Sequence, residues 1–312
     1  MNPENSISRH RTEAHEEHKG VIGFAVSGIK HYENDFYKNS PSSFAALSVT
    51  GSWCGCSCAH CNRTLLPSMH DAGTAEKLRA VIDKLADSGC KGILISGGSD
   101  QNGAVPLLPA MEGIAYAKKK KLKVVVHTGL VDRETAFALK AAKADQILLD
   151  VIGSEKTIRG VYGINRTPGD FLQSMLYCRE AGLELAPHLV VGLDFGRIEG
   201  EYNAVDMVRN AGAKSFVLVV LTPRRGTKMQ NISPPPLAEV VKVFSYTADT
   251  LSNTRISLGC ARPFEYSIEL EKAAVDLGFD AIAYPHADTI QYAASIGFET
   301  FFFEECCCIG QR

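Results

Sequence analysis

The sequence lacks any apolar run long enough to cross a membrane. None of its apolar stretches approaches the roughly 18–20 residues that span a bilayer, and the polar residues 1–20 lack the apolar core of a signal peptide. An excess of charge of one sign is also missing. The formal net charge is −2, so no strong general attraction to nucleic acid or anionic membrane is implied. We therefore expect a soluble cytoplasmic protein with no nucleic-acid or membrane partner.

A clear interdomain linker is missing as well. The proline-rich stretch Ser233–Pro236 reads as a stiff loop before a helix. The chain has 312 residues, of which 45% are hydrophobic, enough for a large core, and chains of about 250–300 residues can form one α/β barrel. We predict an N-terminal extension over residues 1–40, partly ordered around the apolar patch Val21–Val26, and one domain over residues 41–312.

A repeating pattern of short apolar runs and longer amphipathic segments fills the predicted domain. The predicted strands are Phe44–Val49, Gly92–Ser96, Lys123–His127, Gln146–Asp150, Leu185–Gly192, Ser215–Leu221, Arg255–Leu258 and Ala281–Tyr284. The predicted helices are Thr74–Ser88, Leu107–Lys120, Asp132–Ala142, Pro168–Ala181, Glu201–Ala211, Leu237–Leu251, Glu265–Leu277 and Ala287–Ser295. Several end at a glycine stop signal, as at Gly89, Gly182 and Gly278. Eight consecutive strand–helix units indicate an α/β fold, and its simplest closed form is a (β/α)8 TIM-type barrel.

Cysteine is abundant and unevenly spaced. The chain has 10 cysteines. Four of them, Cys54, Cys56, Cys58 and Cys61, lie within eight residues, and Cys306, Cys307 and Cys308 are consecutive. Without an export signal, such clusters are better explained by thiolate ligands to a metal than by disulfides. Cys90 and Cys178 lie at predicted helix edges and read as small buried hydrophobic residues.

The first cysteine cluster has the spacing Cys-x3-Cys-x2-Cys, formed by Cys54, Cys58 and Cys61 directly after the first predicted strand. In a barrel of this kind the chemistry lies at the carboxyl ends of the strands. Three thiolates can hold three irons of a [4Fe–4S] cube and leave the fourth iron open to a ligand. We treat Cys56 as a spectator. The alternative is a structural zinc site that uses all four cysteines of the loop.

This spacing at this position resembles the radical S-adenosylmethionine (radical SAM) superfamily. The resemblance implies that S-adenosylmethionine chelates the open iron and is reductively cleaved to a 5′-deoxyadenosyl radical. His60 stands where the family often has an aromatic residue. Gly97 and Gly98 resemble the glycine-rich motif that contacts the amino group of S-adenosylmethionine, with Ser99 in place of the usual acidic residue and Asp100 next to it.

Further cofactor and substrate residues are predicted on later strands and loops. Asp150 ends the fourth strand and is a candidate partner for a ribose hydroxyl, or a helix cap. Gly192 resembles the glycine beside which adenine packs, and His188 on the same strand is either a cofactor contact or a core histidine. The substrate-binding candidates, whose guanidinium groups offer paired donors, are Arg159, Arg166 and Arg197. The sequence identifies no catalytic acid or base.

A second metal centre is predicted from the remaining cysteines. Cys260 follows the seventh strand, and the terminal set Cys306–Cys308 follows the aromatic run Phe298–Phe303. If the chain end returns to the same face of the barrel, these sulfurs can ligate an auxiliary [4Fe–4S] cluster. Arg262 is a candidate to cover that cluster or orient the substrate. The alternative is a terminal set without a function, although adjacent exposed thiols are prone to oxidation.

Residues 40–310 resemble the biotin-synthase-like branch of radical SAM proteins. The segments Ser96–Asp100, Gly259–Pro263 and Glu305–Cys307 look like a narrower group that includes the two-component lipoyl synthases. That resemblance implies sulfur insertion into an octanoyl chain on a carrier-protein lysine, a sister radical SAM subunit and an external electron donor. Two alternatives stay open: a radical SAM mutase or methylase without sulfur transfer, and a non-enzymatic iron–sulfur or zinc protein.

Overall fold

A parallel sheet of 11 strands forms the framework of the protein. The computed structural model describes residues 20–306. The strands follow the order β11-β1-β10-β9-β8-β7-β6-β5-β4-β2-β3, and every neighbouring pair is parallel. Their bounds are β1 Val21–Ala25, β2 Phe44–Ser48, β3 His70–Asp71, β4 Gly92–Ser96, β5 Lys123–His127, β6 Gln146–Asp150, β7 Leu185–Val191, β8 Ser215–Val220, β9 Arg255–Leu258, β10 Ala281–Ala283 and β11 Glu299–Phe303. Parallel strands require crossover connections, which the helices supply.

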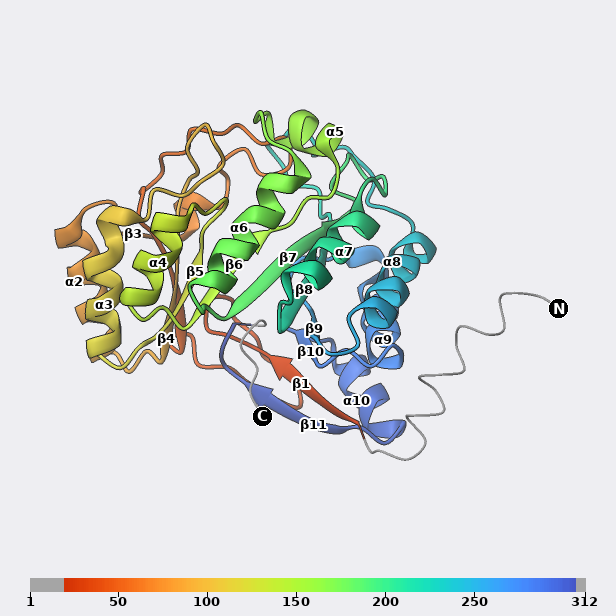
Figure 1. The fold of residues 1–312 in the computed structure, drawn as a ribbon. Coiled ribbons are helices and arrows are strands. Elements are labelled where there is room, and N and C mark those ends of the chain that lie inside the picture. Colours follow the sequence, from red (N-terminus) through yellow and green to blue (C-terminus); the bar gives the residue numbers. More distant parts are fainter. Residues whose placement is uncertain (1–19, 307–312) are drawn as a thin grey trace.

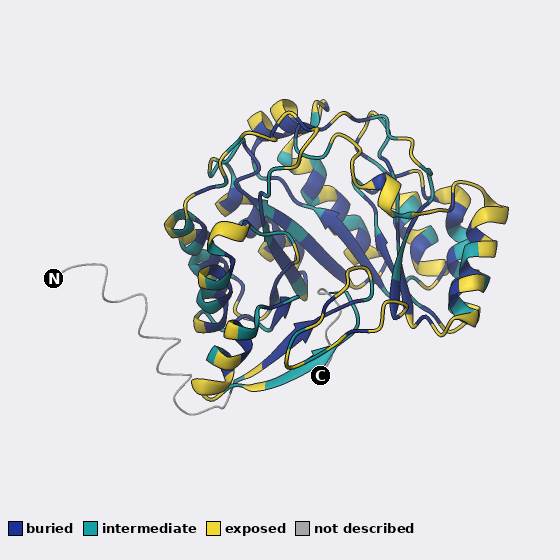
Figure 2. Cartoon of the chain, turned by 180° about the vertical axis from the view of Figure 1, so that it is seen from behind, coloured by how far each residue is buried: buried dark blue, intermediate teal, exposed yellow. Residues whose placement is uncertain are grey.

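The helices cover the outer face of the curved sheet (Figure 1). They are α2 Ala75–Asp87, α3 Met111–Lys119, α4 Arg133–Ala141, the short α5 Glu155–Thr157, α6 Pro168–Glu180, α7 Glu201–Ala211, α8 Leu237–Thr250, α9 Ser267–Asp276 and α10 Ala287–Ser295. Short turns of other helix types lie at Leu66–Ser68, Leu108–Ala110, Ile158–Tyr162 and Phe264–Tyr266. Figure 2 shows the strands buried and the outward faces of the helices exposed. The predicted α/β barrel architecture of eight strand–helix units is confirmed.

Local signals fix the helix ends where they were expected. The side chains of Thr74 and Asp132 accept hydrogen bonds from backbone N–H groups in the first turns of α2 and α4, as N-caps do. After α2, α6 and α9 the chain turns at Gly89, Gly182 and Gly278, with φ of 79°, 68° and 70°. Side chains with a Cβ rarely adopt this left-handed conformation, so glycine stops each helix there.

The sheet does not end at the eight predicted strands. β1, within the stretch predicted as an N-terminal extension, pairs with β10 on one side and with β11 on the other. Among the described residues, the edges of the sheet are therefore β11 and β3, and β10 does not pair with β2. The predicted closed ring of eight strands is replaced by a longer, open ladder. The domain boundary at residue 40 stays a prediction.

Along the strands, the inner face of the sheet changes from an apolar layer to a polar layer nearer the carboxyl ends. A cluster of Phe44, Val125, Leu148, Ala186 and Val217 fills the lower interior. Because side chains alternate along a strand, the residue two positions further on points to the same side. On β5, β6 and β7 those residues are His127, Asp150 and His188. The register therefore places a polar layer inside the barrel, toward the carboxyl ends of the strands.

Candidate active site

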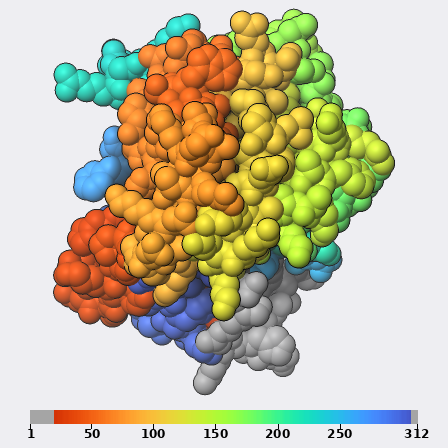
Figure 3. Space-filling model, turned by 90° about the vertical axis from the view of Figure 1, so that its left-hand side faces the viewer, coloured from red at the N-terminus to blue at the C-terminus, as the bar shows by residue number. Residues whose placement is uncertain are grey.

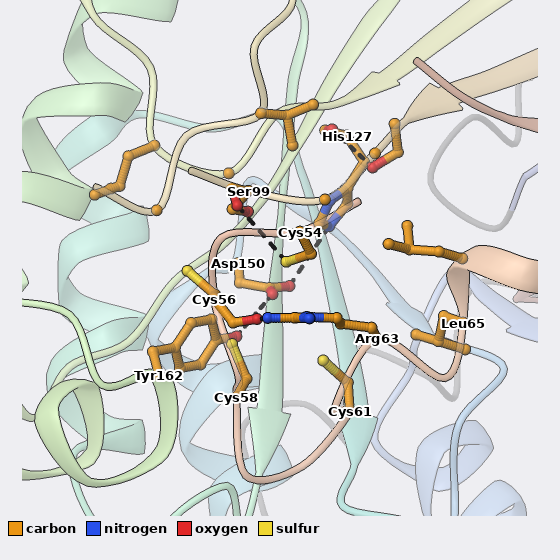
Figure 4. A pocket seen from close by; sticks show the side chains of 18 of the residues that line it. Cys54, Cys56, Cys58, Cys61, Arg63, Leu65, Ser99, His127, Asp150 and Tyr162 are labelled. Carbon is orange, nitrogen blue, oxygen red and sulfur yellow. Dashed lines mark hydrogen bonds and ion pairs between the residues drawn. The ribbon is translucent and has the colours of Figure 1, made fainter. Parts of the chain in front are cut away.

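A pocket opens at the carboxyl edge of β2, β4, β5 and β6, where barrel proteins carry their chemistry. Four cysteines of the loop after β2 line it, together with residues of the loops that follow the next three strands (Figure 4). Its polar or glycine lining is Cys54, Cys56, Cys58, His60, Cys61, Arg63, Ser96, Gly97, Gly98, Ser99, Gly103, His127, Gly129, Asp150 and Tyr162. Its apolar lining is Leu65, Leu66, Met69, Val105, Leu130, Ile164 and Phe171.

Backbone hydrogen bonds hold the cysteine loop against its neighbours. Gly55 N–H donates to the carbonyl oxygen of Ser99 at 2.7 Å, and Ala59 N–H donates to that of Val161 at 2.7 Å. A Cβ on Gly98 would lie 2.0 Å from the carbonyl oxygen of Trp53, so only glycine allows this approach. The predicted glycine motif thus packs directly against the cysteine loop.

The four thiols of the loop occupy different environments. Cys54 Sγ lies 3.6 Å from the carbonyl oxygen of Ser99, and Cys56 Sγ donates to that of Asp100 at 3.0 Å. A hydrogen bond with Cys58 lowers the pKa of Cys61 to about 6, against the opposing effect of burial. Hydrogen bonds with Cys56 and Cys61 raise the pKa of Cys58. A lowered thiol pKa favours the thiolate, which is the form that binds metal.

Asp150 lies at the centre of a polar network beside the cysteines of the loop (Figure 4). Tyr162 O–H donates to Asp150 Oδ2 at 2.9 Å, and His127 Nε2 lies 3.5 Å from Asp150 Oδ1. His188 stands edge-on to His127, with ring centroids 5.9 Å apart, and its Nδ1 lies 3.0 Å from the carbonyl oxygen of Ala186. Asp150 is therefore oriented by two side chains from different elements, and it does not act as a helix N-cap in α5, whose cap is Ser154.

The network changes the protonation of its members. Burial alone would raise the pKa of Asp150, but the hydrogen bond and charge of His127 bring it well below the ordinary value. Burial would lower the pKa of His127, and the bond to Asp150 reverses this and raises it. For His188, burial and the charge of His127 lower the pKa. The arrangement favours an Asp150 carboxylate paired with a protonated His127 beside a neutral His188.

His60 presents an unpaired ring nitrogen at the same site. Its Nδ1 is buried and has no hydrogen-bond partner among residues 20–306, and its ring centroid lies 5.2 Å from that of Tyr162. A buried polar atom without a partner is costly unless a ligand satisfies it. Three thiols with cluster spacing, a close glycine backbone and this open nitrogen fit a bound iron–sulfur cluster with a polar nucleoside ligand.

The predicted arginines and Gly192 lie outside the pocket lining. Arg159 pairs with Glu155, and Arg197 pairs with Asp194 at 2.7 Å. Arg166 lines a neighbouring cavity and donates to the carbonyl oxygen of Asn102 at 3.3 Å. Gly192 directly follows β7, has φ of 79° and packs against Pro235. Their substrate and cofactor roles stay predictions.

The second cysteine set is partly described. Cys260 is exposed after β9, whereas Cys306 packs against the apolar cluster inside the sheet. Cys307 and Cys308 lie outside the described residues. Within residues 20–306, no cysteine forms a disulfide, and no three potential ligands converge as around a single metal ion.

Three contacts lead the chain end into the barrel. Glu304 Oε1 accepts from Ser40 N–H at 3.0 Å and from Tyr37 O–H at 3.1 Å. Glu305 pairs with Lys123 at the start of β5 at 2.7 Å. Arg262 is engaged elsewhere, because it forms a buried ion pair with Glu271 at 2.6 Å and donates to backbone carbonyl groups. The guanidinium of Arg262 is therefore already engaged, which argues against its predicted role at a second cluster or at the substrate.

Sequence reasoning missed His127, Tyr162 and Arg63 as pocket residues. The signal for His127 was present, since it is the last residue of its strand, as Asp150 is of the next one. His127 pairs in register with Leu148, which lies two positions before Asp150 and therefore on the same face. Tyr162 is the last residue of a π-helical turn at Ile158–Tyr162, which sequence periodicity does not reveal. Arg63 has φ of 64° and folds back to donate to the carbonyl oxygen of Cys56 at 3.2 Å.

The fold and site define a parallel α/β barrel protein with a loop of four cysteines lining a pocket at the carboxyl edge of its sheet. Residues 48–199 match the family model of the Radical SAM superfamily, so the chain carries a radical SAM domain. This domain implies a [4Fe–4S] cluster and S-adenosylmethionine. No curated protein matches the chain. No helix within the described residues is long and apolar enough to cross a membrane.

Three solved structures illustrate the likeness in fold. Methylornithine synthase (PylB) is 11% identical with a TM-score of 0.61, over 96% of this chain and 91% of that one. The FeFe-hydrogenase maturase HydG from Carboxydothermus hydrogenoformans is 16% identical with a TM-score of 0.61, over 97% and 73%. Streptococcus suis SuiB bound to S-adenosylmethionine is 14% identical with a TM-score of 0.53, over 80% and 53%. At these identities the likeness establishes the fold alone.

Proposed function

We propose that this protein is a radical SAM enzyme that inserts sulfur into an octanoyl chain carried on a protein lysine. One observation carries the proposal: Cys54, Cys58 and Cys61 line a single pocket with Gly97 and Gly98 at the carboxyl edge of the sheet. When bound there, a [4Fe–4S] cluster supplies the electron that cleaves S-adenosylmethionine to methionine and the 5′-deoxyadenosyl radical.

The residues of the pocket have separate tasks in this proposal. The three cysteines hold the cluster, with Cys56 as a spectator that donates to the carbonyl oxygen of Asp100. The backbone of Gly97 and Gly98 contacts the amino group of S-adenosylmethionine. The Asp150 carboxylate, held by His127 and Tyr162, accepts from a ribose hydroxyl. Charge-assisted hydrogen bonds of this type are among the stronger ones.

The apolar side of the pocket supports an alkyl substrate. This side is lined by Leu66, Val105 and Ile164 from the segments after β2, β4 and β6, and by Phe171 of α6. These side chains provide no polar partner for a charged chain. A thin hydrocarbon chain can displace water from such a surface with a gain in free energy. In the reaction, a C–S bond replaces an alkyl C–H bond and the hydrogen atom leaves in 5′-deoxyadenosine. An auxiliary cluster would supply the sulfide, and its iron would take up the one electron that is left when the carbon radical bonds to that sulfide.

The auxiliary cluster is the second part of the proposal. Its predicted ligands are Cys260, Cys306, Cys307 and Cys308. The described member that supports it is Cys306, which packs against the apolar cluster inside the sheet. That cluster includes Val125 and Ala186, which lie two positions before His127 and His188 on their strands. A sulfur source beside Cys306 would approach the alkyl chain from inside the sheet, whereas the radical would form at the carboxyl edge of the strands. An external electron donor and a sister subunit complete the proposed system.

The test uses the anaerobically reconstituted protein with S-adenosylmethionine, dithionite and an octanoyl-lysine peptide. Mass spectrometry is expected to detect 5′-deoxyadenosine and a peptide that has gained sulfur. Replacement of Cys306 by serine should remove sulfur insertion and leave 5′-deoxyadenosine formation, whereas Cys178→Ser, a buried change in α6, serves as the control. If 5′-deoxyadenosine forms but the wild-type product never contains sulfur, the sulfur-insertion proposal is wrong, and the mutase or methylase alternative replaces it.

A further inference from the structure

Two neighbouring loops, one of which lines the pocket, carry basic residues that form no ion pair within residues 20–306. Arg63 lies on the cysteine loop and lines the pocket. Arg224, Arg225 and Lys228 lie on the loop after β8, and all three are exposed. We call these four residues the basic rim. Asn62 Nδ2 donates to the carbonyl oxygen of Gly226 at 3.1 Å, so the two loops are held side by side. Figure 3 shows the loop around residue 225, in cyan, projecting from the surface beside the orange cysteine segment.

The basic rim differs from the other charged residues of this face. Arg159, Arg166, Arg197 and Lys156 each lie within ion-pair distance of an acidic side chain. No ion pair involves any basic-rim residue within the described part of the chain. Residues 221–236 contain no aspartate or glutamate. This local excess arises in a chain whose formal net charge is −2.

Resting on the proposed function, we infer that the basic rim is the docking surface for an acidic carrier domain that presents the acyl chain. Basic and acidic surfaces that face each other steer association and fix the register of the complex. The position supports this occupant, because Arg63 belongs both to the basic rim and to the pocket wall. A carrier held there would deliver a lysine-linked chain directly into the pocket while its folded part stays outside.

A protein partner is favoured over a nucleic acid by the apolar residues of the same loop. Leu65 lines the pocket and is 45% exposed, and Trp53 on this loop is 54% exposed. Protein interfaces combine an apolar or aromatic centre with a polar border. Nonspecific nucleic-acid binding instead relies on larger basic surfaces that contact successive phosphates. We therefore commit to an acidic protein domain and use RNA as a competing ligand in the test.

The experiment compares two charge reversals in the reconstituted full-length protein. The rim variant carries Arg224→Glu, Arg225→Glu and Lys228→Glu. The control carries Lys91→Glu, Lys119→Glu and Lys121→Glu, which make the same change of charge at exposed positions near the amino ends of β4 and β5. The probes are an octanoylated lipoyl-carrier domain of net negative charge and an uncharged octanoyl-lysine peptide. Binding is measured at low and high salt, together with turnover of both substrates.

The rim variant is expected to bind the carrier domain at least about tenfold more weakly at low salt, with turnover of the peptide unchanged. The control should bind like the wild type. Equal carrier binding by both variants, or tighter binding of an RNA oligonucleotide than of the carrier domain by the wild type, would overturn the inference. Loss of carrier binding in the rim variant supports the docking surface even if no form of the protein inserts sulfur. The absence of sulfur insertion would contradict the proposed reaction but not the docking surface.

Discussion

The two cysteine sets of this protein differ in how their sulfurs are brought together. Cys54, Cys58 and Cys61 lie on one loop between β2 and the turn at Leu66–Ser68, and all three line one pocket. Cys260 and Cys306 are separated by α9, β10, α10 and β11. One is exposed, and the other packs inside the sheet. The first set depends on local spacing, and the second depends on the whole fold.

Cysteines that are close in the sequence can converge whether or not the sheet closes into a ring. Cysteines from distant segments converge only if the strands between them place the chain end correctly. The chain end reaches the interior of the barrel past the edge formed by β11. Its position depends on contacts of Glu304 and Glu305 with residues 37–40 and Lys123. We therefore expect variants of the cysteine loop to abolish cleavage of S-adenosylmethionine, and variants of the chain end to affect sulfur insertion while cleavage continues.

The largest effect is expected in the loop. Cys54→Ala, Cys58→Ala or Cys61→Ala should each reduce 5′-deoxyadenosine formation under dithionite to background, because three thiolates are the minimum for an open-iron cube. Cys56→Ala is the matched control from the same loop and should retain activity. Wild-type yield from any of the three single variants would contradict the assignment of ligands, and so would an inactive Cys56→Ala.

A smaller effect is expected at Asp150, which belongs to neither cysteine set. Asp150→Asn keeps the size of the side chain but removes the charge that pairs with His127. We expect S-adenosylmethionine to bind roughly 10–100-fold more weakly, as expected for loss of a charge-assisted hydrogen bond, while the iron content stays at the wild-type level. Binding is measured by equilibrium dialysis. Unchanged affinity would mean that Asp150 does not contact the ribose.

The sequence predicted the strands and the cysteine loop well because their signals are local. Short apolar runs that alternate with amphipathic segments, together with glycine stops such as Gly182, predict the bounds of most strands and helices to within a few residues. β1 was missed because a single weak apolar patch resembles any short buried segment, and its partners, β10 and β11, lie more than 250 residues away. The side-chain pairing of His127 with Asp150 depends on strand register, which composition alone does not specify.

A still smaller, pH-dependent effect is expected from the His127–Asp150 pair. The pKa of His127 is raised above 6.5 and that of Asp150 is lowered below 3.8. Their mutual stabilisation is therefore fully present between these two values. It is lost as the pH rises through the raised pKa of His127 or falls through the lowered pKa of Asp150. The urea midpoint of His127→Gln should lie furthest below that of the wild type near pH 5 and approach it above pH 8. A pH-independent difference would contradict the pairing.

The smallest effect is expected at the anchor of the chain end. Lys123→Gln removes the partly exposed ion pair with Glu305 and should lower the free energy of unfolding by about 0.5 kcal/mol in urea titrations. The same variant should reduce sulfur insertion more than 5′-deoxyadenosine formation if the pair positions Cys306. Lys121→Gln, an exposed neighbour before β5, is the control. Equal losses in both reactions would show that the anchor does not distinguish the two cysteine sets.

The most direct test of two separate cysteine centres is the iron and sulfide content of the Cys54/Cys58/Cys61 triple-alanine variant after anaerobic reconstitution. We predict about four irons per chain, the content of one [4Fe–4S] cluster, with cluster-like absorbance and no cleavage of S-adenosylmethionine. A variant that binds no iron under the conditions that load the wild type would show that the second centre does not exist. Iron at the wild-type level in this variant would show instead that Cys54, Cys58 and Cys61 do not hold the first cluster.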